Sequence, residues 1–360
     1  MSLACGMVGL AGSGKTTIYN AITAAGVASF DGAEEHTAVV SVPDPRLDDL
    51  AAIYHPVKIV PAQMKMVDIP GLQAGAVEKT GRGSKLLAHI KDVDALLHVV
   101  KCFTPAGATI PDDTINPVGD VETIALEMMV ADTKTLQNKL DRLSKKVKSG
   151  EKSAIQEYSD CEKVKKGLDE GTPARRQNLS EHEMTSIYEC NLLSVKPVLY
   201  IANVATIEDA ANPKIKALEN FAQAEGSEVI TVFGRDEADI AQLKPEERGE
   251  FLAELGLNES SMARLLGAAY RKLGLVTFFT VGPDEVRAWT CHQGDKAPVA
   301  AGKIHTDMEK GFICMEVTSY RDLLELGSEA AVLKAGKQRI EGKTYEVREG
   351  DVVVVRFNKG

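Results

Sequence analysis

The sequence predicts an α/β fold: a parallel sheet that carries a phosphate-binding loop, with a helical hairpin inserted into it and a small, mostly β domain after it. Three observations support this fold class. Short, almost continuously apolar runs are separated by helix-length intervals, which is typical of parallel strands covered on both faces. A glycine-rich motif directly follows the first of these runs. Two amphipathic helical patterns and then several β-rich runs occupy the later parts of the chain.

The predicted sheet and its first helix come from hydrophobic patterning. Five apolar runs are the predicted strands, and they cover residues 3–8, 63–67, 95–100, 198–202 and 228–232. A helical pattern begins at Lys15, where Ile18, Ala21 and Ile22 fall on one side. This strand–loop–helix start places the glycine-rich motif at the carboxyl edge of the sheet.

The insertion lies between the third and fourth predicted strands. Leu136, Leu140, Leu143 and Val147 recur at three- and four-residue spacing, which marks an amphipathic helix. A break near Gly150 separates it from a second helical pattern, so we predict two antiparallel helices. Lys and Arg outnumber Asp and Glu in this hairpin. This excess can be an ordinary solvated face or a contact surface for RNA.

The last part of the chain has a different pattern. Short β-rich runs alternate with Gly-Pro, Gly-Asp and Glu-Gly turns, which indicates a small, mostly β domain. The predicted strands are residues 276–281, 287–290, 312–317, 344–347 and 352–357.

Composition limits the class of protein. The 360 residues suffice for two or three domains, and a net charge of −10 argues against a protein that binds polyanions over its whole surface. The six cysteines form no C-x-x-C pair, and the histidines show no metal-ligand spacing. His98 lies in an apolar run and is interpreted as a core residue. Without a long apolar run or a signal peptide, we expect a cytoplasmic monomer that does not contact membranes.

The phosphate-binding motif occupies residues 9–16, which fit G-x-x-x-x-G-K-[ST]. Glycines let backbone N–H groups turn toward phosphate oxygens, and the helix N-terminus adds its dipole. Lys15 supplies a charge for the β- and γ-phosphates, and the Thr16 hydroxyl is a Mg²⁺ ligand. The candidate nucleotide-binding residues of this motif are Gly9, Leu10, Ala11, Gly12, Ser13, Gly14, Lys15, Thr16 and Thr17.

The second element of the predicted site is the tetrapeptide Asp68-Ile69-Pro70-Gly71. A carboxylate at the tip of a neighbouring strand can hold Mg²⁺, and the N–H of Gly71 can sense the γ-phosphate. Switch enzymes carry a Gln after this glycine to orient the attacking water, whereas this chain has Leu72. Because Leu72 can neither donate nor accept, we expect slow intrinsic hydrolysis, with Lys15, Gly71 and Leu72 as the catalytic positions.

Base recognition is predicted at Asn203-Val204-Ala205-Thr206, after the fourth strand. Guanine-reading proteins use Asn-Lys-x-Asp, whose carboxylate accepts two N–H groups of guanine. Thr206 cannot replace that carboxylate, which should remove at least ~1.5–3 kcal/mol of guanine preference, so ATP is favoured over GTP. Asn203 and Val204 are the candidate base contacts, with Asn203 meeting the amine and N7 of adenine. The alternative is that Asn203 only caps a helix.

These motifs together resemble the YchF/OBG-like ATPase family, a branch of the Obg-related translation-factor GTPases. The resemblance runs over nearly the whole chain and is closest near its end. It is carried by residues 9–16, 42–47, 67–72, 98–100, 196–200, 277–282, 285–289, 297–307 and 350–358.

The resemblance implies three domains. They are a P-loop G domain over 1–120 and 192–275, an inserted coiled-coil-like helical domain over 121–191 and a TGS domain over 276–360. It also implies ATP and Mg²⁺, an apolar residue at position 72, and association with the ribosome or ribosomal RNA through the helical and TGS domains. Thr37 is a candidate Mg²⁺-sensing threonine. The chain departs from the family pattern at Gly12, where Asn is usual, and at Thr206, where Glu is usual.

We therefore predict a slow ATPase that acts as a nucleotide-driven switch on the ribosome or RNA. Two other classes stay open. Leu72 and the altered base motif are compatible with a nucleotide sensor that does not hydrolyse its ligand. Gly-Ser-Gly-Lys-Thr loops also occur in small-molecule kinases, for which Arg82 would be the arginine of the lid. The identity of the phosphate acceptor separates these classes.

Overall fold

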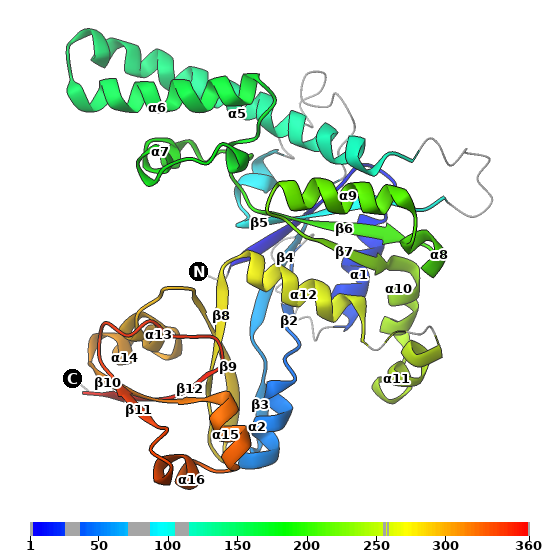
Figure 1. The fold of residues 1–360 in the computed structure, drawn as a ribbon, viewed down its shortest axis with the longest axis vertical. Coiled ribbons are helices and arrows are strands. Elements are labelled where there is room, and N and C mark those ends of the chain that lie inside the picture. Colours follow the sequence, from blue (N-terminus) through cyan, green and yellow to red (C-terminus); the bar gives the residue numbers. More distant parts are fainter. Residues whose placement is uncertain are drawn as a thin grey trace. The chain divides into compact units, whose positions relative to one another are not determined.

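The computed structural model describes residues 3–25, 37–70, 87–104, 115–254, 257 and 259–358, which form two compact units (Figure 1). The described strands form two six-stranded sheets, one centred on each unit. Within these described ranges, every helix is too short or too polar to cross a lipid bilayer.

The first unit is built on a largely parallel sheet with strand order β2-β4-β1-β5-β6-β7. The pairs from β4 to β7 are all parallel, which confirms the five predicted strands. The additional strand β2 was not predicted, because its five residues alternate in burial and form no continuous apolar run. The strands are β1 (Ala4–Val8), β2 (Thr37–Ser41), β4 (Gln63–Asp68), β5 (Ala95–Lys101), β6 (Val198–Val204) and β7 (Val229–Phe233).

Helices pack on this sheet through buried apolar side chains. On one face, Val121 and Met128 of one helix and Leu218 of another join strand residues such as Leu96 and Val198 in a single core cluster. The helix that follows the phosphate loop packs against α10. The helices of this part are α1 (Lys15–Ala25), α8 (Ile207–Ala210), α9 (Pro213–Ala224), α10 (Gly234–Gln242) and α11 (Pro245–Glu254). The next helix, α12 (Ser261–Lys272), begins in the first unit and continues in the second from Leu266.

The predicted hairpin is present as α5 (Pro117–Lys148) and α6 (Lys152–Asp169), which run side by side (Figure 1). Leu136, Leu140 and Leu143 are buried in a cluster with apolar residues of α6, as the spacing predicted. The carboxylate of Asp132 accepts hydrogen bonds from the backbone N–H groups of Leu193 (2.8 Å) and Ser194 (2.7 Å) and so fixes the long helix to the returning chain. Short helices complete the return: η2 (Ala174–Arg176), α7 (Glu181–Ile187) and η3 (Tyr188–Cys190).

The second unit has the strand order β11-β10-β12-β8-β9-β3. Its strands are β3 (Lys58–Val60), β8 (Leu275–Thr280), β9 (Glu285–His292), β10 (Phe312–Ser319), β11 (Arg339–Glu341) and β12 (Asp351–Phe357). Its helices are α2 (Arg46–Tyr54), α13 (Ala297–Ile304), α14 (Thr306–Lys310), α15 (Tyr320–Leu326) and α16 (Glu329–Lys334). Four of the predicted strands are confirmed.

The predicted strand at 344–347 is wrong. Tyr345 O accepts from the N–H of Ala297 (2.7 Å), and the N–H of Val347 donates to Asp295 O (3.1 Å), so this stretch is bonded to the start of α13 and the preceding turn. Val347 is nevertheless 3% exposed, which explains the apolar pattern. The strand that borders β10 lies a few residues earlier, at β11.

The segment Val39–Met64 groups with the C-terminal part of the chain, whereas the sequence-based boundaries put it in the nucleotide-binding domain. Strand β3 pairs with β9 in parallel. The Arg46 guanidinium forms an ion pair with Glu349 (2.6 Å), and Tyr54 Oη donates to Glu329 (2.8 Å). These partners lie more than two hundred residues away in sequence, so local patterns could not reveal them.

Candidate nucleotide-binding site

The phosphate loop follows β1, the strand between β4 and β5 in the sheet. Gly12 and Gly14 have φ angles of 80° and 87°, in the left-handed region that favours glycine. A Cβ atom at Gly14 would also lie 2.1 Å from the side-chain nitrogen of Asn203. The N–H of Ile18 donates to Gly14 O (3.1 Å), so the helix begins directly from the loop. The predicted strand–loop–helix arrangement is therefore present.

Lys15 and Asp68 meet beside this loop. Lys15 Nζ donates to Asp68 Oδ1 at 2.5 Å, and the two side chains are only 8% and 13% exposed. Asp68 is the last residue of β4 and lies in register with Met7 of β1. Lys15 and Asp68, which the sequence analysis assigned separately to the phosphates and to Mg²⁺, are thus brought together by the parallel β1–β4 ladder.

The oxygen groups that can hold Mg²⁺ are Thr16 and Asp68. Thr16 lies in the first turn of α1 and is exposed, as is Thr17. Asp68 Oδ1 is bonded to Lys15, which leaves Oδ2 for another partner. A hydroxyl and a carboxylate oxygen are the hard ligands that Mg²⁺ prefers, so this donor set fits the ion. Thr37 is the first residue of β2.

Two predicted catalytic positions, Gly71 and Leu72, lie outside the described residues, as does Arg82. Their roles stay predictions from the sequence.

The side chain of Asn203 is hydrogen-bonded at both of its polar atoms within the protein. Its Nδ2 donates to the carbonyl oxygen of Ser13 (2.8 Å), and its Oδ1 accepts from the N–H of Gly234 (3.2 Å). The side chain is 4% exposed, and Gly234 is the first residue of α10. The amide therefore fastens the phosphate loop to the start of this helix. The bond to Gly234 gives Asn203 a role at the start of α10, and its contact with adenine stays a prediction.

Val204 is also corrected by the structure. Its side chain is 2% exposed and belongs to the core cluster beneath the sheet. The Val204 side chain does not point toward a base, so this prediction is wrong for the side chain. The reason is that β6 extends two residues beyond its predicted end and turns Val204 inward.

The loop after β6 is closed by a pair of residues, one of which the sequence analysis missed. Thr206 Oγ1 accepts from the N–H of Asp209 (3.2 Å), and Asp209 Oδ2 accepts from the N–H groups of Ala205 (3.2 Å) and Thr206 (3.1 Å). This reciprocal pattern resembles a capping box, and the spacing Thr-x-x-Asp could have indicated it. Thr206 thus begins α8, and the nearby carboxylate is bonded to backbone.

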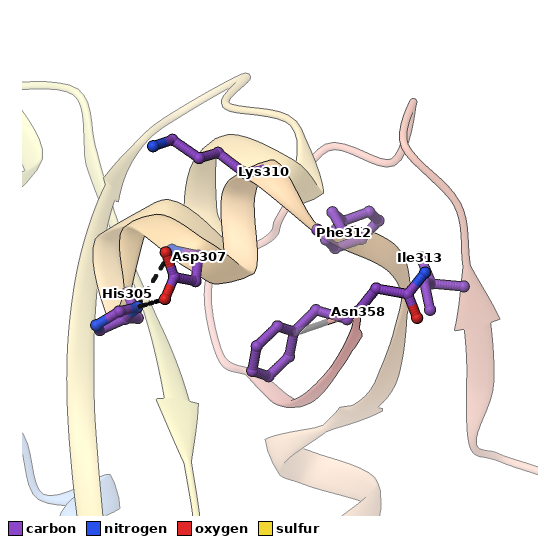
Figure 2. A pocket seen from close by; sticks show the side chains of 8 residues that line it. His305, Asp307, Lys310, Phe312, Ile313 and Asn358 are labelled. Carbon is purple, nitrogen blue, oxygen red and sulfur yellow. Dashed lines mark hydrogen bonds and ion pairs between the residues drawn. The ribbon is translucent and has the colours of Figure 1, made fainter. Parts of the chain in front are cut away.

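A separate hollow of about 870 Å³ lies in the second unit, where Figure 2 shows His305, Asp307, Lys310 and Asn358 around it. The His305 side chain accepts from the N–H of Asp307 (3.2 Å) and so caps α14. None of the phosphate-loop residues lines this hollow.

Comparisons with known proteins agree with this geometry. Residues 4–139 match a family model described as 50S ribosome-binding GTPase, and residues 275–358 match the YchF-GTPase C-terminal model, described as a protein of unknown function.

Relatives of similar length match the chain from end to end. The chain is 42% identical to "Ribosome-binding ATPase YchF" of Bacillus subtilis (strain 168), over 99% of this chain and 100% of that protein. It is 38% identical to "Obg-like ATPase 1" of Oryza sativa subsp. japonica, over 99% of this chain and 92% of that protein. The solved structure of the Schizosaccharomyces pombe YchF GTPase superposes with a TM-score of 0.88 at 33% identity, covering 99% of this chain and 98% of that one.

Proposed function

Because this chain belongs to the YchF family, we propose that it binds ATP at the loop from Gly9 to Thr16, hydrolyses it slowly and associates with the ribosome in a nucleotide-dependent way. The observation that carries this proposal is the convergence of Lys15, Thr16 and Asp68 on one glycine-rich loop. The 42% identical relative is named a ribosome-binding ATPase, and the N-terminal family model describes a GTPase.

The phosphates are held by this chain's own groups. The loop N–H groups and the start of α1 bind the oxygens, and the Lys15 ammonium adds a positive charge at the β- and γ-phosphates. Thr16 and Asp68 would hold Mg²⁺, which when bound neutralises charge that develops on the phosphates. Leu72 offers no group to orient water, so intrinsic turnover is slow and a bound partner or the substrate completes the site.

Preference for ATP over GTP follows from the loop after β6. A guanine site needs a carboxylate that accepts two N–H groups, and Thr206 has none. The nearest acidic side chain of this loop, Asp209, already accepts from the Ala205 and Thr206 amides. Turning it toward a guanine would break both bonds, each worth about 1 kcal/mol or more.

The remaining parts serve as contact surfaces in this proposal. The nucleotide-binding sheet, the helical hairpin and the C-terminal β part correspond to a G domain, an inserted helical domain and a TGS domain. We assign ribosomal RNA contacts to the last two, in a monomeric protein. Thr37 on β2 and Asp68 on β4 are the described residues of this chain that would respond to the nucleotide state.

The proposal is tested with purified protein, ATP or GTP, Mg²⁺ and ribosomes. We expect binding of ATP in preference to GTP, slow release of inorganic phosphate, and sedimentation with ribosomes that differs between ATP and ADP. Lys15→Ala should abolish hydrolysis, while Lys216→Ala, the same substitution at a 72% exposed side chain, should leave it unchanged. The proposal would be contradicted if neither triphosphate binds in the presence of Mg²⁺, or if sedimentation with ribosomes is the same with ATP and ADP.

The same assay separates the two alternatives. A sensor would show no phosphate release above background even in a single turnover. A kinase would transfer the γ-phosphate to a metabolite. Neither is favoured, because the relatives are named ATPases and the N-terminal family model describes a GTPase.

A further inference from the structure

The turn between the two helices of the hairpin concentrates positive charge. Residues 142–152 contain five cations and a single acid, Glu151, in a chain with a net charge of −10. All five side chains are exposed. We call this set the tip cluster; it consists of Arg142, Lys145, Lys146, Lys148 and Lys152.

Outside residues 142–152, in the part of the hairpin that we call the shaft, three lysines form ion pairs with carboxylates. Lys163 pairs with Glu183 (2.5 Å), Lys165 with Asp169 (2.8 Å), and Lys139 with Glu157 (2.6 Å). Within the ranges that the structure describes, no carboxylate forms an ion pair with a tip-cluster side chain. These three shaft lysines are therefore paired with carboxylates of the protein itself, whereas the five cations of the tip cluster present their charge to solvent.

Packing explains why the charge surrounds the tip. Leu136, Leu140 and Leu143 point into the hairpin core, and the cations occupy the other sides of the last turns of α5. Cations at a helix C-terminus also complement the helix dipole, by about 0.3–1 kcal/mol each. That effect alone would account for Lys145, Lys146 and Lys148.

Lys152 does not fit this simpler explanation. It is the first residue of α6, whose first turn contains no acidic residue. A cation at a helix N-terminus is unfavourable, because the dipole is positive there. Positive charge is thus placed at the tip even where the dipole of α6 opposes it, next to a single acid, the N-cap residue Glu151.

We infer that the tip cluster binds the phosphate backbone of folded RNA; this inference rests on the proposed association with ribosomes. Lys and Arg contacts to phosphates need no apolar anchor and carry no base preference. Protein interfaces, by contrast, have an apolar centre. Among the described residues 142–152, no large apolar side chain is exposed; the nearest is Ile155, at 46%. The chemistry of the tip therefore matches RNA better than an acidic protein.

The test compares two triple variants of the full-length protein that lose the same charge. The tip variant is Lys145→Gln, Lys146→Gln and Lys148→Gln, and the shaft variant is Lys163→Gln, Lys165→Gln and Lys166→Gln. Binding to a fluorescent RNA duplex of about 20 base pairs is measured by anisotropy across a series of KCl concentrations. Circular dichroism verifies that both variants fold.

Each lost phosphate contact should lower the slope of log affinity against log salt by about 0.7–0.9. We expect the tip variant to lose about two to three units of slope and at least about tenfold in affinity near 0.1 M KCl, and the shaft variant to bind within about twofold of wild type. Equal losses in both variants would overturn the inference, as would an affinity independent of salt. Competition by polyglutamate as strong as that by unlabelled RNA would overturn it in favour of an acidic protein partner.

Two further measurements separate this inference from the proposed function. The tip variant should hydrolyse ATP at the wild-type rate, because none of its residues belongs to the nucleotide site. It should sediment with ribosomes less than the shaft variant does. If wild-type protein binds ATP and sediments with ribosomes while the tip variant sediments equally well, the inference fails and the proposed function stands. If wild-type protein binds RNA through the tip but binds neither ATP nor ribosomes, the proposed function fails.

Discussion

Replacing Asn203 by alanine should loosen the phosphate loop. The substitution leaves the Ser13 carbonyl and the Gly234 N–H without their partner, in a place where the wild-type side chain is 4% exposed. An unsatisfied buried polar group costs about 1–3 kcal/mol, so the two together should lower the free energy of unfolding by about 2–6 kcal/mol. Urea unfolding measures this loss directly.

The same variant decides what Asn203 does for the ligand. If the amide positions the loop, affinity should fall by about tenfold or more for ATP, GTP and inorganic triphosphate alike, because all three use the loop N–H groups. Titration calorimetry with these three ligands and Mg²⁺ gives the comparison. Thr206→Ala is the matched control, since it removes an exposed helix cap worth about 1 kcal/mol and should leave triphosphate affinity unchanged. A loss confined to ATP would refute the reasoning and show that Asn203 contacts adenine.

Three other substitutions give sharp expectations. Asp68→Asn removes the charge that faces Lys15 and a Mg²⁺ ligand, so phosphate release should fall by about a hundredfold or more while ATP still binds. Burial lowers the pKa of His98 to about 3. Between about pH 6.5 and 3, His98 therefore binds a proton in the unfolded chain but not in the folded one. The free energy of unfolding should drop by up to about 1.4 kcal/mol per pH unit over this range. His98→Gln should remove this component from urea unfolding curves. Glu349→Gln breaks the ion pair with Arg46. Because the Glu349 side chain is 50% exposed, the free energy of unfolding should fall by only about 0.5–1 kcal/mol.

Each of these expectations has an outcome that contradicts it. Wild-type hydrolysis by the Asp68 variant would exclude its role beside the phosphate loop. A His98 variant that keeps the full acid sensitivity of wild type would assign that sensitivity to other groups. The Glu349 effect should vanish near 1 M salt, because exposed ion pairs are screened, and persistence there would point to a packing defect.

The sequence was most informative where structure depends on neighbouring residues. The five strands of the parallel sheet, the hairpin and the phosphate loop follow from hydrophobic spacing and from glycines in a fixed pattern. Lys15 and Asp68 were each named from the sequence, whereas their pairing depends on the parallel β1–β4 ladder, which brings the ends of these two strands together. His98 was correctly assigned to the core from its apolar surroundings.

Some predictions failed for a common reason. The stretch 344–347 looks like a strand because Val347 is buried, yet its backbone groups bond to the start of α13 and to the turn before it. Val204 was taken for a base contact because of its place in the motif, although its side chain belongs to the core. In both cases the apolar residue type correctly indicated burial, but the sequence did not show which part of the protein the residue packs or bonds against.

The sequence by itself determined the phosphate-binding motif and the α/β scaffold that carries it, because the loop is continuous in the chain. Only the tertiary structure decided how that loop is held and where the segment Val39–Met64 belongs. Asn203 reaches Ser13 across 190 residues, and Arg46 meets Glu349 at 2.6 Å from almost the other end of the chain. Such partners come together only when the sheets assemble, so no local pattern encodes them.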